Sequence, residues 1–200
     1  MKEELERVLA QREKRYIIDA ERVPAAVLVP LYQKQGTYYI VFIKRTEKVK
    51  DHKGQISFPG GARDNEDQTL LHTAVRESRE EIGLQAQDIE VIGELDDELT
   101  TTSNYTVTPF VAVIPCPYSF QKNADEVADI LEVPIAALMN NGRMSENDEI
   151  LDGEPIESYT YEYRGNIIWG ATARILKKLL DIIGGINRKE NDIRQPGHNP

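Results

Sequence analysis

The chain contains a single cysteine, Cys116, among its 200 residues. One thiol excludes an internal disulfide and any metal cluster built on several thiolates. Long apolar runs are also missing, because none reaches the roughly 18 residues that a membrane-spanning helix requires. Residues 1–4 include two glutamates and do not resemble the start of a secretory signal. We therefore expect a cytoplasmic protein with no membrane partner.

Positive charge is scarce as well. The sequence has 24 lysines and arginines against 34 aspartates and glutamates, which gives a formal net charge of −10. This balance argues against generic binding to nucleic acid or to anionic membranes. A small anionic substrate would need local charge compensation, which a divalent cation can supply.

The composition is that of an ordinary globular protein, with 40% hydrophobic and 29% charged residues. Two hundred residues are enough for one domain with a hydrophobic core. We expect a single domain over residues 1–185. Gly184-Gly185 is expected to end the last helix near residue 183, which leaves residues 186–200 as a polar, frayed tail.

Apolar patterning predicts strands over residues 24–31, 38–43, 89–95 and 105–114, and a strand pair within residues 159–168. Helices are predicted over residues 2–14, 70–82 and 171–183, with one or two short helices over residues 125–140. Thr69 and Gly83 are the expected N-cap and left-handed C-cap of the second helix. Helices and strands mixed in this way predict a three-layer α/β/α sandwich.

The predicted helix over residues 70–82 carries an unusual cluster of acidic residues. Glu77, Glu80 and Glu81 occupy positions i, i+3 and i+4, and fall within an arc of about 100° on one face. Like charges at these spacings repel each other and weaken an isolated helix. The three side chains therefore form either a solvated acidic face or a cation site, and oxygen ligands suit Mg²⁺ or Mn²⁺.

Two neighbouring features favour the cation site. Leu71, Val75, Ser78 and Ile82 form the expected core face, which places the three glutamates beside it, at the edge of a groove. Gly60-Gly61 lies just upstream, and glycines let a backbone expose N–H donors and approach a phosphate closely.

The segment Arg76–Leu84 resembles the second half of the Nudix hydrolase signature, Arg-Glu-Xaa-Xaa-Glu-Glu-Xaa-Gly closed by an aliphatic residue. Ser78 stands where that family usually has an aliphatic residue. The first half fits only with one inserted residue: Gly61, five residues, Asp67, then eight residues before Arg76. Asp67 thus occupies the first acidic position of the signature, and we do not assign it to the metal.

The inserted register is similar to that of one branch of this family, the coenzyme A pyrophosphatases. Their additional signature resembles residues 44–61, where Lys50 replaces the usual arginine and Thr46 the usual serine or alanine. Lysine lacks the planar fork with which arginine binds a phosphate. The resemblance covers residues 22–182, and it implies a Nudix fold with a mixed central sheet.

This resemblance implies an enzyme that hydrolyses the diphosphate of coenzyme A or its thioesters to 3′,5′-ADP and 4′-phosphopantetheine. It implies that Glu77 and Glu81 bind Mg²⁺ or Mn²⁺, and that Glu80 is a further ligand or the base that activates water. Glu77 and Glu80 are the expected catalytic pair. Glu126 is a candidate additional acid; the alternative is an exposed glutamate at the start of a helix.

Positive charge is concentrated in residues 44–57, which makes this segment the candidate phosphate-binding region. We expect Arg45, Lys50 and His52 to contact the substrate together with Gly60 and Gly61. The alternative is a solvated loop, and His52 has the further alternative of a local backbone hydrogen bond.

Other interpretations stay open. Lys50 and Thr46 are compatible with a different nucleoside diphosphate derivative, such as ADP-ribose or NADH. A catalytically silent domain for ligand sensing is a third hypothesis, although it has no need for three mutually repelling glutamates. Trp169 either stacks on a substrate base or packs in the core. A homodimer is an open alternative, with the N-terminal helix and residues 142–160 as contacts.

Overall fold

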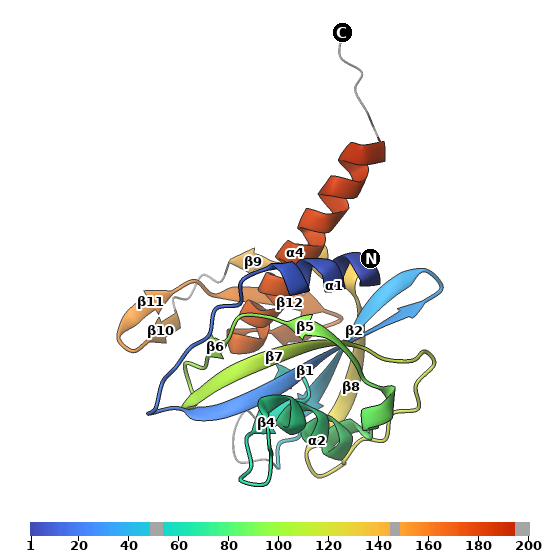
Figure 1. Ribbon diagram of the computed structural model, residues 1–200. Helices are drawn as coiled ribbons and strands as arrows, with labels where there is room; N and C mark the ends of the chain where they lie inside the picture. Colours follow the sequence, from blue (N-terminus) through green and yellow to red (C-terminus); the bar gives the residue numbers. More distant parts are fainter. Residues whose placement is uncertain (49–53, 145–148, 195–200) are drawn as a thin grey trace.

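The fold is that of a computed structural model, which describes residues 1–48, 54–144 and 149–194 (Figure 1). Within these residues the centre of the molecule is a mixed eight-stranded sheet. Its main path runs β3 (Ile56–Ser57), β2 (Thr37–Arg45), β1 (Val23–Lys34), β7 (Tyr105–Val113) and β5 (Glu90–Glu94). Off this path, β4 (Gly60–Ala62) pairs with β1, β6 (Glu98–Leu99) with β7, and β8 (Val127–Pro134) with β2. The β1–β7 pair is parallel and the other pairs are antiparallel.

Strand β1 is buried on both faces, as its continuous apolar sequence predicts. Its side chains alternate between two hydrophobic cores, with Ala25, Val29 and Leu31 in the first and Ala26, Leu28 and Tyr32 in the second. The sheet therefore needs a covering layer on each side.

Helices supply these two layers. α1 (Lys2–Gln11), α3 (Ile135–Met139) and α4 (Gly170–Arg194) contribute side chains to the first core, and α2 (Leu70–Ile82) contributes to the second. Figure 1 shows α1 and α4 on one side of the sheet and α2 on the other. The predicted three-layer α/β/α sandwich is confirmed. In the part of the chain that the structure describes, no helix combines the length and apolar character needed to cross a membrane.

Short elements connect these layers. A 3-10 helix, η1 (Ala86–Asp88), precedes β5. β10 (Glu149–Leu151) and β11 (Glu154–Ile156) form an antiparallel hairpin, and β12 (Tyr159–Tyr163) pairs with β9 (Arg143–Met144) and β13 (Asn166–Ile168). The strand pair predicted within residues 159–168 is confirmed. Its turn residues Arg164 and Gly165 have positive φ angles of 50° and 75°, as two-residue hairpin turns often require.

The prediction of helix over residues 125–140 is wrong for most of that segment. Residues 127–134 form β8, which pairs with β2 from Tyr39 to Arg45. Only Ile135–Met139, directly after Pro134, is helical. Long-range pairing with a buried strand here outweighs the local preference for helix.

The predicted end of the last helix is also wrong. α4 continues through Gly184-Gly185 as far as Arg194, so residues 186–194 are not a frayed tail. Ile183 and Ile186 are both buried in the first core. Their burial offsets the conformational cost of two glycines inside a helix, about 1 kcal/mol each. Residues 195–200 lie outside the described residues.

Candidate active site

Helix α2 has the ends that its sequence predicts. The Thr69 hydroxyl accepts a hydrogen bond from the backbone N–H of His72 at 3.1 Å. At the other end Gly83 adopts the left-handed conformation with φ 70°, and its N–H donates to the carbonyl of Arg79 at 3.0 Å. These caps fix where the helix starts and stops, and thereby which residues face the sheet.

The buried face of α2 matches the predicted one at Ser78 and Ile82 and differs from it elsewhere. It consists of Thr73, Ala74, Ser78, Glu81 and Ile82, whereas Leu71 and Val75 are only partly buried. Ser78 tolerates burial because its hydroxyl donates to the carbonyl of Ala74 at 2.7 Å. The hydroxyl therefore explains how a serine fills a position where the Nudix signature has an aliphatic side chain.

As a consequence the three glutamates are not equivalent. The side chain of Glu81 is 1% exposed, that of Glu77 is 18% exposed and that of Glu80 is 47% exposed. The sequence predicts all three at the edge of a groove. Glu77 and Glu81 do line a cavity, with the side chain of Glu81 fully buried in its wall, whereas Glu80 lies outside the lining, so the prediction is wrong for Glu80. A buried carboxylate is costly unless something compensates its charge.

Neighbouring groups compensate the negative charge of the buried Glu81 carboxylate only in part. The backbone N–H of Gly60 donates to Glu81 Oε2 at 2.9 Å, and Arg45 Nη1 lies 3.5 Å from Glu81 Oε1. Burial nevertheless raises the pKa of Glu81 to about 8, since the hydrogen bond from Gly60 and the charge of Arg45 lower it less than desolvation raises it. A cation at this carboxylate would supply the missing charge.

Glu77 lies one helical turn before Glu81 and packs against β4. A Cβ atom added to Gly61 would lie 2.7 Å from Glu77 Cδ, so the absence of a side chain at residue 61 makes room for this carboxylate. Arg76 Nη1 donates to Glu77 Oε1 at 2.8 Å. Burial raises the pKa of Glu77 as well, although Arg76 lowers it in part.

Asp67 is held by the same arginine. Its carboxylate is nearly buried and accepts hydrogen bonds from Arg76 Nη2 at 2.8 Å and from Arg76 Nε at 3.0 Å. These bonds hold the pKa of Asp67 well below its usual range. Asp67 therefore orients Arg76, and Arg76 in turn orients Glu77.

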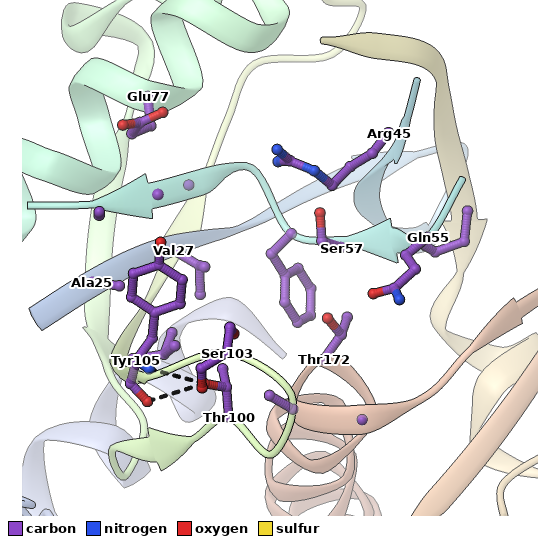
Figure 2. Close-up of a pocket in the computed structure, with 18 of the residues that line it drawn as sticks. Ala25, Val27, Arg45, Gln55, Ser57, Glu77, Thr100, Ser103, Tyr105 and Thr172 are labelled. Carbon is purple, nitrogen blue, oxygen red and sulfur yellow. Dashed lines mark hydrogen bonds between the residues drawn. The ribbon is translucent and has the colours of Figure 1, made fainter. Parts of the chain in front are cut away.

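A cavity of about 720 Å³ opens beside these groups (Figure 2). Its charged lining residues are Arg45, Lys48, Glu77, Glu81, Asp125 and Glu126. Another part of the lining carries no charge and consists of Thr100, Thr101, Thr102, Ser103, Tyr105 and residues 169–172. In Figure 2, Glu77 and Arg45 lie on one side of the view, and Thr100, Ser103 and Thr172 on the other. The cavity therefore has a charged end and a neutral end.

Thr46 brings Glu126 to the charged end. The Thr46 backbone N–H donates to the carbonyl of Glu126 at 2.9 Å, and its hydroxyl donates to the carbonyl of Asp125 at 2.8 Å. Glu126 lies in the turn before β8 and not at the start of a helix, so that alternative for Glu126 is wrong.

The remaining predicted site residues have different placements. Gly60 and Gly61 line the cavity, but the Gly60 N–H donates to Glu81 and is not free for a phosphate. Glu80 is outside the cavity lining and pairs with Arg76 Nη1 at 3.1 Å.

Lys50 and His52 lie outside the described residues. Arg45 is in the lining, and its Nε atom is buried with no hydrogen-bond partner among the residues that the structure describes.

Sequence reasoning missed most of the neutral end. Residues 100–103 form a polar loop without a recognisable motif, and only the fold places them against the first turn of α4. Trp169 lines the cavity and is 39% exposed. A partly exposed indole at a cavity wall favours the ligand-stacking alternative over core packing.

The charged end fits a divalent cation. Among the described residues, no three histidine, cysteine, aspartate or glutamate side chains are grouped closely enough to hold a metal by themselves. Mg²⁺, however, is usually held by one or two carboxylates, waters and substrate phosphates. Glu77 and Glu81 provide two such oxygen donors, and the undercompensated charge of Glu81 favours a cation beside them.

Comparisons with known proteins identify the family to which this sequence is similar. The family model of the NUDIX domain matches residues 22–152. The chain is 35% identical over 155 residues to an "Uncharacterized Nudix hydrolase NudL" of Photorhabdus laumondii, covering 78% of this chain and 82% of the relative. A protein of the same name from Yersinia pestis is also 35% identical, over 78% of this chain and 77% of its own length.

Solved structures share the fold at low sequence identity. The Nudix hydrolase RenU of M. smegmatis aligns with a TM-score of 0.53 and 19% identity, over 90% of this chain and 91% of its own. A MutT/nudix family protein from Enterococcus faecalis aligns with a TM-score of 0.53 and 14% identity, over 96% of this chain and 69% of its own.

Proposed function

The chain belongs to the Nudix hydrolase family, and we propose that it hydrolyses the diphosphate of coenzyme A or its thioesters with Mg²⁺ or Mn²⁺. The products are 3′,5′-ADP and 4′-phosphopantetheine or its acyl form. The observation that carries this proposal is the cavity itself, in which a carboxylate-lined end continues into a neutral end beside Trp169. Coenzyme A has a corresponding division, with a diphosphate joined to a long uncharged arm.

In this proposal the charged end binds and orients the diphosphate. Glu77 and Glu81 hold the cation, which when bound neutralises phosphate charge and lowers the pKa of a water. The Arg45 guanidinium, with its Nε atom buried and unpaired among the described residues, donates to a phosphate oxygen. Arg76 keeps Glu77 directed toward the cavity.

The residue that accepts the proton from the attacking water is either Glu80 or Glu126. Glu80 follows from the resemblance to the Nudix signature, and reaching the cavity requires it to leave Arg76. Glu126 already lines the cavity, and its charge raises the pKa values of Glu77 and Glu81. We propose Glu80 as the base, in agreement with its signature position, and compare Glu80→Gln with Glu126→Gln as the test. Loss of the base lowers kcat by about 10²–10⁴-fold.

The specific observation that favours a second substrate is Lys50, which stands where the coenzyme A signature has arginine. The alternative substrates are therefore ADP-ribose and NADH, which also combine a diphosphate with uncharged groups. A catalytically silent domain fits less well, because it has no need to bury the charge of Glu81 at considerable cost.

A substrate panel tests the proposal. The protein is incubated with coenzyme A, ADP-ribose and NADH, each with Mg²⁺ and with Mn²⁺, and kcat/KM is compared. We expect the highest value for coenzyme A, with 3′,5′-ADP as a product, and no turnover by Glu81→Gln. A clear preference for ADP-ribose would overturn the coenzyme A assignment while leaving diphosphate hydrolysis intact.

A further inference from the structure

Arg174 connects three parts of the molecule that surround the neutral end of the cavity. It lies in α4, two residues beyond the cavity-lining residues 169–172, and its side chain is only 7% exposed. Its Nε donates to Glu98 Oε1 at 2.8 Å, and its Nη2 donates to the carbonyl of Leu99 at 2.8 Å. Its Nη1 donates to Glu149 Oε2 on the β10–β11 hairpin.

The partners of Arg174 lead directly into the opposite wall. Glu98 and Leu99 form β6, and the loop of residues 100–103 that follows β6 lines the cavity. Thr101 in this loop also donates to Glu149 Oε2 at 3.2 Å. One guanidinium therefore ties the first turns of α4 to β6, from which the loop starts, and reaches the loop itself through Glu149 and Thr101.

The loop itself is held as a unit. The backbone N–H of Tyr105 donates to the Thr100 hydroxyl at 3.0 Å (Figure 2). Arg22 donates to the Thr100 carbonyl at 3.2 Å and pairs with Asp152 on the β10–β11 hairpin at 2.5 Å. Two arginines thus hold consecutive carbonyls, those of Leu99 and Thr100, where the loop begins.

The charges around Arg174 balance. Lys178, one turn further along α4, pairs with Glu98 at 2.7 Å, so two cations face the carboxylates of Glu98 and Glu149. Arg174 makes three charge-assisted hydrogen bonds in different directions, which suits the fixed fork of a guanidinium. A lysine at this position keeps the charge but cannot reproduce this geometry.

We propose that Arg174 is a positioning residue for substrate recognition, which sets the width of the neutral end by fixing the loop of residues 100–103 relative to the first turns of α4. It acts through Leu99 and Glu149 and does not contact the diphosphate. The proposal rests on the proposed function only in that an uncharged substrate group occupies the neutral end. Loss of this geometry weakens binding of that group and leaves the chemistry at the charged end unchanged.

Trp169 provides a direct readout of the neutral end, because it is the only tryptophan of the chain and lies in the cavity wall. Titration with 3′,5′-ADP and with 4′-phosphopantetheine, neither of which contains the bond to be cleaved, shows which half of the substrate changes its fluorescence. Inorganic pyrophosphate, measured as a competitive inhibitor, reports on the charged end alone.

The test compares Arg174→Lys with Arg12→Lys. Arg12 is a matched control, since it is also a partly buried arginine paired with a carboxylate, Asp96, and lies outside the cavity lining. For Arg174→Lys we expect KM for coenzyme A to rise about tenfold, equivalent to about 1.4 kcal/mol. We expect kcat and the inhibition constant of pyrophosphate for Arg174→Lys to stay within about twofold of the parent values. For Arg12→Lys we expect KM, kcat and the inhibition constant all to match those of the parent.

Glu149→Gln is a second variant in case Arg174→Lys does not fold. Glu149 does not line the cavity, and we expect its substitution to raise KM for coenzyme A by about threefold, in the same direction as Arg174→Lys does. Three results would each overturn the proposal. The first is a rise in the inhibition constant of pyrophosphate equal to the rise in KM for coenzyme A, the second is a fall in kcat at constant KM, and the third is an equal rise in KM for Arg12→Lys. If coenzyme A is not a substrate, the proposed function fails, and the same comparison with the best substrate of the panel still decides the role of Arg174.

Discussion

The backbone N–H of Gly60 donates a hydrogen bond to the carboxylate of Glu81 at 2.9 Å, and this bond joins β4 to α2 inside the molecule. A Cβ atom at residue 60 would lie 2.3 Å from the carbonyl oxygen of Ala26, so only glycine lets the two strands approach this closely. Gly60 and Gly61 therefore have different structural roles. Gly60 supplies a donor to Glu81, and Gly61 leaves space for Glu77.

The space at Gly61 leads to a first prediction. In Gly61→Ala the new methyl group would meet the Glu77 carboxylate at 2.7–2.9 Å and displace it from the cavity wall. Because the nearest atoms belong to the end of a flexible side chain, the fold tolerates the change. We expect kcat/KM to fall by about tenfold or more with little change in Tm. An unchanged kcat/KM would show that the position of Glu77 is not critical.

The buried carboxylate of Glu81 leads to a second prediction, on pH dependence. Burial raises the pKa of Glu81 from 4.5 to about 8, so the folded protein binds a proton here more tightly than the unfolded chain does. Glu81 thus contributes stability that is fully present below pH 4.5 and is lost as the pH rises through about 8. In the presence of a chelator, Glu81→Gln should be more stable than the parent at pH 8.5, with a Tm difference of about 4 °C that shrinks toward pH 5.

Thermal unfolding at several pH values measures this difference. Mg²⁺ provides the control, because a cation that binds the folded state raises its stability. Addition of Mg²⁺ at pH 8.5 should raise the Tm of the parent and leave Glu81→Gln nearly unchanged. A pH-independent Tm difference between the two proteins would contradict the assignment of a charged, undercompensated carboxylate to Glu81.

The sequence predicts α2 well because the information is local. Thr69 and Gly83 mark its ends by side-chain and backbone preferences that depend on neighbouring residues alone. The rotation of the helix is predicted only in part, since Ser78 and Ile82 are buried as the apolar pattern indicates, but Glu81 is buried beside them. The apolar pattern gives no signal for a buried carboxylate, and the burial of Glu81 becomes visible only in the folded structure.

The neutral end of the cavity could not be predicted for a related reason. Residues 100–103 and residues 169–172 meet at one cavity where β6 packs against α4, and both Arg174 and Lys178 of α4 pair with Glu98 of β6. Nothing in the sequence pairs Arg174 with Glu98 or Glu149, which lie 76 and 25 residues away. β8 is a similar case, because its strand conformation depends on pairing with β2.

The Asp67–Arg76 pair leads to a third prediction. Replacement of Asp67 by Asn removes the charge that Arg76 faces and should cost about 2 kcal/mol of stability at pH 7. Since Arg76 holds the pKa of Asp67 well below its usual range, this contribution is present above about pH 4 and is lost as the pH falls further. Urea unfolding of both proteins at pH 7 and pH 3 measures it. A stability difference that persists undiminished at pH 3 would contradict the ion pair as its source.

A fourth prediction concerns the course of α4 through Gly184-Gly185. A Cβ atom at residue 185 meets no atom within 4 Å, and the backbone there is helical. Gly185→Ala should therefore stabilise the protein by about 0.5–1 kcal/mol, because alanine loses less conformational entropy than glycine in a helix. The expected rise in Tm is about 2 °C.

Gly36→Ala is the control for this measurement, with the opposite expected change in Tm. Residue 36 also has open space around its Cα, but its φ angle is 82°, which alanine adopts only under strain. Gly36→Ala should lower Tm while Gly185→Ala raises it, so the sign of each change follows from the backbone and not from contacts. If α4 instead ended near residue 183, Gly185 would lie outside the helix, and alanine there would be neutral or destabilising. The direction of the shift for Gly185→Ala thus decides between the helix end that the glycine pair predicts and the continuous helix that the burial of Ile186 supports.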